Sequence, residues 1–183
     1  AIPREAFAVF GVPAEMAGDV CERCRAFAVE IVEEFKYTEP NLQMTLNKIG
    51  GVEWVLDPVT MQSLVGALVG LPNGVLAMSH AVEGLVETSS NLASVKFGAE
   101  GIVVTTSQRS SVESAKRYAA QTVEAVLRLS GAEVAHSDGY PGWSPDPDSY
   151  LLHVTEQCYE RLFAVKPKVR AIHAGLECGL FLE

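Results

Sequence analysis

The sequence predicts an α+β fold made of two similar units, each with short strands packed against one long helix. Two observations support this. Short runs with alternating apolar residues flank longer segments in which apolar residues recur at helical spacing. Turns rich in glycine and proline, such as 70–74, separate the segments. With 183 residues, 48% of them hydrophobic and 20% charged, the chain is long enough to bury a substantial core.

The first unit is expected over residues 6–46. Residues 6–12 predict a strand that Pro13 ends, and residues 42–46 predict a second strand because their apolar residues alternate. Between them, residues 14–37 predict a long helix. Its apolar residues recur at helical spacing and comprise Val20, Cys24, Phe27, Ile31 and Phe35. This order of elements is a β-α-β unit.

A short helix is expected over residues 57–70. Asp57 is a favourable N-cap residue, and Pro58 suits the first helical position because its missing N–H would have no partner there. The glycine-rich turn at 70–74 ends this helix.

The second unit is expected to contain a hairpin of 82–95 and 101–107, a helix over 110–130 and a strand over 133–137. The hairpin turns near 98–101, where two glycines stand close together. Ser110 is expected to open the helix, with Glu113 in the position of the acid of a capping box.

Residues 137–148 form the clearest linker, because their prolines and glycines are unsuited to continuing a sheet. After the linker, a helix over 148–163 and a strand over 168–174 are expected. The predicted domain boundary therefore lies near residue 140, with one domain over 1–140 and a piece of another over 141–183.

The composition bears on partners and location. A net charge of −9 argues against nucleic acid and anionic membranes, both of which favour surfaces rich in Lys and Arg. Cys21 and Cys24 have CxxC spacing, but a zinc ribbon needs a second such pair and a redox motif belongs at a helix start. We therefore interpret them as ordinary helix cysteines, and free thiols fit a reducing, cytoplasmic location.

The run from His173 to Phe181 is the most informative stretch. It predicts a strand that enters a tight turn at Gly175 and then a first helical turn. The free N–H groups of such a turn attract anions, and ligands commonly bind at the ends of strands in α/β sheets. The alternative is a buried strand–helix turn without a ligand, in which His173 is a satisfied core histidine.

This run, His-Ala-Gly-Leu-Glu-Cys-Gly-Leu-Phe, resembles the late motif of the bacterial aminoacyl-histidine dipeptidases, also called Xaa-His dipeptidases. These are zinc metallopeptidases of the M20 clan. Residues 1–6, 86–92 and 108–111 resemble further stretches of the same family. The resemblance implies that residues 1–140 are a lid domain with ferredoxin-like layers of antiparallel sheet and helices on one face. Residues 141–183 would then begin the return to an α/β catalytic domain.

The resemblance also implies an activity, hydrolysis of Xaa-His and related dipeptides at a two-zinc site in the cytosol. Zinc sites of this kind need clustered His and carboxylate ligands. The chain has no H-x-D motif, its four histidines are scattered, and the pair Glu33-Glu34 suits a solvated helix face. No residue of the chain is therefore expected to be catalytic or to bind metal, and the chain alone is expected to be an inactive fragment of a longer enzyme.

Substrate recognition is the role left for this chain. Lids of the clan carry an Arg that holds the substrate carboxylate and an Asn that reaches its backbone, which by resemblance would be Arg109 and Asn91. The alternatives are a surface salt bridge for Arg109 and a β-bulge at Asn91. His173 and the turn of Gly175, Leu176 and Glu177 would face the substrate from the other side.

A different class of function stays open from the sequence. The chain would then be a non-catalytic structural or dimerisation module, or a ligand-sensing α+β domain. Lids of the clan often pair, and unpaired strand edges favour association. The expected partner is thus a dipeptide substrate. A homodimer formed through the lid is the second partner that stays open.

Overall fold

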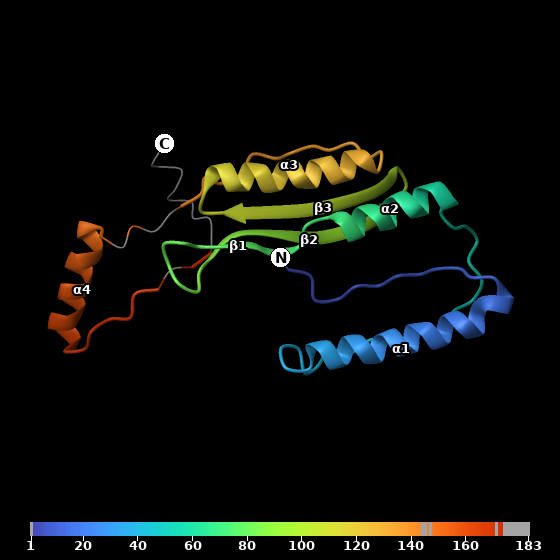
Figure 1. The fold of residues 1–183 in the computed structure, drawn as a ribbon, viewed down its shortest axis with the longest axis horizontal. Coiled ribbons are helices and arrows are strands. Elements are labelled where there is room, and N and C mark those ends of the chain that lie inside the picture. Colours follow the sequence, from blue (N-terminus) through green and yellow to red (C-terminus); the bar gives the residue numbers. More distant parts are fainter. Residues whose placement is uncertain (1, 144–145, 147, 171, 174–183) are drawn as a thin grey trace. The chain divides into compact units, whose positions relative to one another are not determined.

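The computed structural model describes residues 2–143, 146, 148–170, 172 and 173. Within this part of the chain the elements are η1 (Ala14–Met16), α1 (Ala17–Phe35), α2 (Pro58–Gly70), β1 (Gly74–Met78), β2 (Val86–Gly98), β3 (Gly101–Ser110), α3 (Glu113–Leu129) and α4 (Tyr150–Phe163). Figure 1 labels the α-helices and the strands. The chain divides into two compact units, one of residues 6–58 and one of residues 1–5 and 59–183. The predicted α+β class is confirmed.

The sheet is a three-stranded antiparallel meander in the order β1-β2-β3. Gly98 pairs with Gly101, so a two-residue loop joins β2 to β3, and the φ of Gly101 is +141°. A positive φ at such a turn favours glycine, which explains why the predicted hairpin turns there. β1 was not predicted, although the short apolar run Val75-Leu76-Ala77-Met78 follows a turn.

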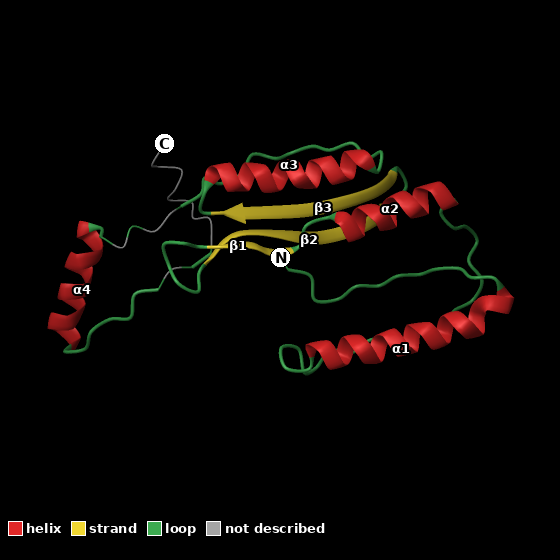
Figure 2. Ribbon diagram, in the orientation of Figure 1, coloured by secondary structure: helices red, strands yellow, loops and turns green. Residues whose placement is uncertain are grey.

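Helix α3 covers one face of this sheet, as Figure 2 shows. Side chains alternate along β3, where residues 102, 104, 106, 108 and 110 are more buried than their neighbours. The core between helices and sheet contains Ala67 of α2, Leu71 just after that helix, and Val123 and Leu127 of α3. The partly buried side chains packed against it are those of Leu68, Leu92, Val104, Val126 and Val134.

The start of α3 differs from the expected capping box. The N-cap residue is Val112, and no side chain caps the helix. The Ser110 hydroxyl instead accepts a hydrogen bond from the Val112 N–H at 3.0 Å and contacts the Thr88 hydroxyl at 2.8 Å. The Glu113 carboxylate accepts hydrogen bonds from Gly142 N–H and from Lys116 Nζ. Ser110 still belongs to β3 and lies two residues before the N-cap position, too early for a capping box.

The unit of residues 6–58 contains the long predicted helix as η1 followed by α1, and Cys21 and Cys24 lie within α1 as expected. The strands predicted over 6–12 and 42–46 are not formed. Neither segment has a ladder partner among the described residues, and a strand needs one to satisfy its backbone groups. The β-α-β arrangement expected of this unit is therefore wrong in its strands and right in its helix.

Two further predicted strands are not seen among the described residues. Residues 133–137 and the described part of 168–174 have no strand assignment, whereas α4 forms close to its predicted bounds. The second unit is thus a β-hairpin with one added strand, packed on α3. Among the described helices, none is both long enough and apolar enough to cross a membrane. The domain boundary near residue 140 stays a prediction.

Candidate functional site

The face of the sheet that points away from α3 carries polar side chains from β2 and β3. In the ladder, Ser89 lies opposite Arg109, and Asn91 lies opposite Ser107. Residues two apart on a strand share a face and are separated by about 6.8 Å. The hairpin therefore brings Arg109 and Asn91, both predicted from the sequence, onto one face and within reach of one small ligand.

His173 joins these residues from a distant part of the chain. Its Nε2 lies 2.8 Å from the Oγ of Ser89, a hydrogen bond between residues 84 positions apart. His173 also makes a hydrogen bond with the backbone of Val86, so β2 holds its imidazole at two points. The structure thus places His173 beside the strand pair that carries Arg109.

The electrostatics of this cluster favour a neutral imidazole. Partial burial, and then the charge of nearby Arg109, lower the pKa of His173 below its ordinary value of 6.5, while the hydrogen bond with Val86 acts in the opposite direction. The side chain of Arg109 is exposed. Among the described residues, no carboxylate forms an ion pair with this guanidinium.

An accessible guanidinium without a carboxylate partner in the described chain can bind a carboxylate through two parallel hydrogen bonds. The surface salt bridge considered as the alternative for Arg109 is therefore not formed within the described residues. Asn91 is half-buried and has an interaction of its own. The β-bulge considered for it lies nearby, between Leu92 and Ser94.

Some of the predicted site is outside the described part. Gly175, Leu176 and Glu177 lie beyond residue 173, so their predicted role stays a prediction. Ser89 is the residue that sequence reasoning missed. The pairing of the two hairpin strands was the sequence signal that could have identified the residue opposite Arg109. A regular ladder counted from Gly98 and Gly101, however, would place Ser90 there and not Ser89. The bulge between Leu92 and Ser94 shifts the pairing by one residue.

The described residues do not fit a metal centre. No group of three or more His, Cys, Asp or Glu side chains in this part of the chain could hold a metal ion. His136, in the loop after α3, pairs with Glu124 at 3.0 Å, and His153 of α4 lies 3.8 Å from Glu156; both histidines are exposed. The described residues therefore supply no complete set of ligands for the zinc ions that the family resemblance implies.

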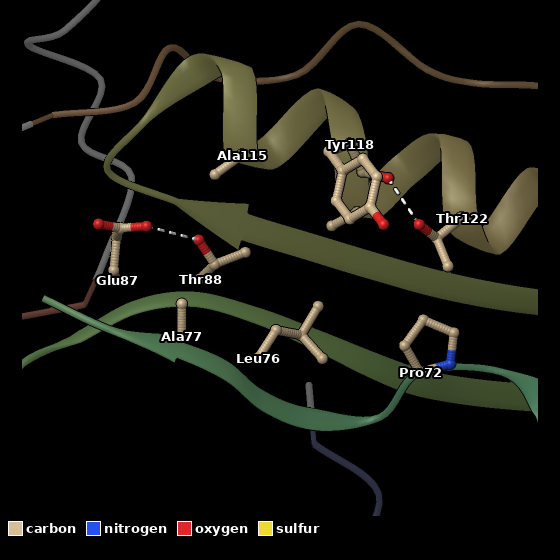
Figure 3. Close-up of a pocket in the computed structure, with 9 residues that line it drawn as sticks. Pro72, Leu76, Ala77, Glu87, Thr88, Ala115, Tyr118 and Thr122 are labelled. Atoms are coloured by element: carbon tan, nitrogen blue, oxygen red, sulfur yellow. Dashed lines mark hydrogen bonds between the residues drawn. The ribbon is translucent and has the colours of Figure 1, made fainter.

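A separate hollow lies on the helix side of the sheet, shown in Figure 3. It has a volume of about 360 Å³ and is lined by Pro72, Leu76, Ala77, Glu87, Thr88, Ala115, Tyr118, Ala119 and Thr122. Its walls are mainly apolar, and the Thr88 hydroxyl donates to the Glu87 carboxylate at 3.3 Å. This hollow has no cluster of convergent charged groups, so the polar face around Arg109 is the better candidate for a site.

Comparison with known proteins finds similarity to dipeptidases. No family model matches the chain. The cytosol non-specific dipeptidase of Escherichia coli (strain K12) is 33% identical over 181 residues, which are 99% of this chain and 37% of that protein. The crystal structure of aminoacylhistidine dipeptidase from Vibrio alginolyticus matches with a TM-score of 0.85 and 32% identity, over 93% of this chain and 35% of that chain.

The chain thus spans little more than a third of the length of each of these relatives. Both matches cover nearly the whole chain, and both relatives carry the name of a dipeptidase. The family resemblance predicted from the run at 173–181 is confirmed. The chain is therefore similar, over nearly its whole length, to one part of each of these two dipeptidases.

Proposed function

We propose that this chain is part of a dipeptidase and recognises the free carboxylate of the dipeptide through Arg109. The observation that carries the proposal is the exposed guanidinium of Arg109, which lies beside the Ser89–His173 pair with no carboxylate partner in the described chain. The similarity of the chain to two dipeptidases supports a substrate that has a carboxylate.

Each predicted residue has a role in this proposal. Arg109 holds the carboxylate with two charge-assisted hydrogen bonds. His173, whose neutral imidazole is held by Ser89 and Val86, lies beside the carboxylate and borders its site. Asn91, on the same face of the sheet, reaches the backbone of the dipeptide. Gly175, Leu176 and Glu177 would face the substrate from the segment that follows His173.

Finer features of the whole enzyme also belong to this proposal. They are a two-zinc site, a preference for Xaa-His dipeptides, a cytoplasmic location and a lid role for residues 1–140. The described residues contain no group of side chains that could hold a zinc ion. The role proposed for this chain is therefore recognition, and we expect the chain alone to be inactive.

The test uses the longer enzyme of which this chain forms a part. Arg109→Ala is assayed with a dipeptide and with the amide of the same dipeptide, which lacks the carboxylate. A hydrogen bond to a charged group contributes about 1.5–3 kcal/mol, so kcat/KM for the dipeptide should fall roughly 10- to 100-fold. The amide should be affected little.

Lys96→Ala is the matched control, because Lys96 is an exposed cation at the far end of the same strand pair. It should leave both substrates unchanged. Equal losses of kcat/KM with dipeptide and amide after Arg109→Ala would refute the carboxylate role.

A second candidate function is homodimerisation through the sheet. β1 and β3 are the edge strands, and exposed apolar residues occur on both, with Val75 57% and Val103 61% exposed. Such edges can pair with another chain. Sedimentation across a range of concentrations tests this, and a monomer at every concentration would count against it.

A further inference from the structure

We propose that Ser89 is a positioning residue, whose hydroxyl holds the imidazole of His173 beside Arg109 so that one carboxylate can contact both side chains. This inference rests on the proposed function, because it refines the same carboxylate site. Ser89 would not touch the substrate. It would act through His173.

The contacts of His173 support this role. Its side chain is held by hydrogen bonds to two residues of β2, the Ser89 hydroxyl at 2.8 Å and the Val86 backbone. The described residues just before it, 168–170 and 172, belong to no helix or strand. Among the described residues, the contacts with β2 are therefore what holds the imidazole in place.

The strand pairing brings Arg109 to the same place. Ser89 and Arg109 are direct partners across the antiparallel ladder, so their Cα atoms are about 4.5–5.5 Å apart and their side chains leave the same face. Partial burial first, and then the charge of nearby Arg109, lower the pKa of the imidazole. Hydroxyl, imidazole and guanidinium thus form one compact group.

The bulge in β2 is what makes this arrangement possible. Without the shift between Leu92 and Ser94, Ser90 would be the partner of Arg109. The side chain of Ser90 is buried on the face covered by α3 and receives a hydrogen bond from Gln108 at 3.2 Å. The bulge therefore selects Ser89 as the hydroxyl that faces His173 and Arg109.

The test is a double-mutant cycle in the longer enzyme. Loss of a neutral hydrogen bond corresponds to a change of about 2- to 13-fold in binding, so Ser89→Ala should raise KM for a dipeptide within this range and leave kcat unchanged. His173→Ala should raise KM as well. Because Ser89 acts through His173, the double variant should match His173→Ala rather than multiply the two effects.

Two further variants separate positioning from damage to the strand. Ser89→Thr keeps the hydroxyl and suits a strand, so it should restore the parent KM. Ser94→Ala removes a hydroxyl from the same face of the same strand and should leave KM unchanged. Far-UV circular dichroism confirms that each variant is folded.

The inference is overturned if the effects of Ser89→Ala and His173→Ala on KM multiply in the double variant, because the two residues then act independently. An unchanged KM in Ser89→Ala, or a fall in kcat with KM unchanged, would overturn it too. If Arg109→Ala lowers kcat/KM for the dipeptide and spares its amide, such a result rejects the role of Ser89 alone. If Arg109→Ala lowers kcat/KM equally for both substrates, the carboxylate site itself is rejected, and this inference with it.

Discussion

Truncation of Leu127 to alanine should destabilise the protein strongly, because Leu127 is one of the buried residues of the core between α2, α3 and the sheet. Its side chain is 8% exposed and belongs to the cluster with Ala67, Leu71 and Val123. The substitution removes three carbon atoms. At about 0.8 kcal/mol for each buried methylene, the lost transfer free energy is roughly 2.4 kcal/mol.

The cavity left behind adds to this value, since the surrounding side chains relax only partly. The cluster is small and bordered by half-buried residues, so we expect a total loss near the lower end of the usual range, about 2.5–3.5 kcal/mol. In urea, a slope of about 2 kcal/mol per molar converts this loss into a midpoint lower by roughly 1.2–1.8 M. Circular dichroism at increasing urea concentration measures the midpoint.

Leu129→Ala is the matched control. It makes the same chemical change two residues later in the same helix, where the side chain is 89% exposed. Its effect on the free energy of unfolding should stay within about 0.5 kcal/mol. Equal midpoint shifts for the two variants would refute the placement of Leu127 in the core.

Two further predictions concern the loop that follows residue 137. A Cβ at Gly142 would lie 2.9 Å from the Ser110 carbonyl oxygen, so Gly142→Ala should displace this loop and speed its hydrogen exchange, whereas a Cβ at Gly139 meets nothing within 4 Å and Gly139→Ala should have little effect. The hydrogen bonds from Lys116 and then Gly142 lower the pKa of Glu113. The contribution of Glu113 to the free energy of unfolding is therefore present above its unfolded-state pKa and is lost as pH falls through its folded-state pKa. The Glu113 side chain is 56% exposed, so Glu113→Gln should lower the free energy of unfolding by less than about 1 kcal/mol at pH 7. Urea titrations should show the difference between parent and variant disappearing in acid. A difference that grows in acid would contradict the prediction.

Local sequence determined the elements whose signals are local. The helical spacing of apolar residues predicted α1, α3 and α4, and the paired glycines at 98 and 101 predicted the turn between β2 and β3. These signals work because backbone torsions and side-chain periodicity depend on neighbours in the chain. The order of residues alone therefore sufficed to place the polar residues Arg109 and Asn91 on one hairpin.

Strand formation was harder to predict because it depends on a partner. Residues 6–12 and 42–46 alternate as strands do, yet no described strand pairs with them, whereas the short run of β1 pairs with β2 and forms one. The capping role of Ser110 was wrong for a related reason. Its hydroxyl lies against Thr88 of the neighbouring strand, which the order of residues around α3 does not reveal.

The candidate site combines both kinds of information. The sequence supplied Arg109, Asn91 and His173 as residue types suited to recognising a small anionic ligand. Only the tertiary structure decided that Ser89 stands opposite Arg109, because a single bulged residue changes which side chains share a face. Only the tertiary structure brought His173 to that pair, because its contact with Ser89 spans 84 positions and no local propensity encodes such a distance.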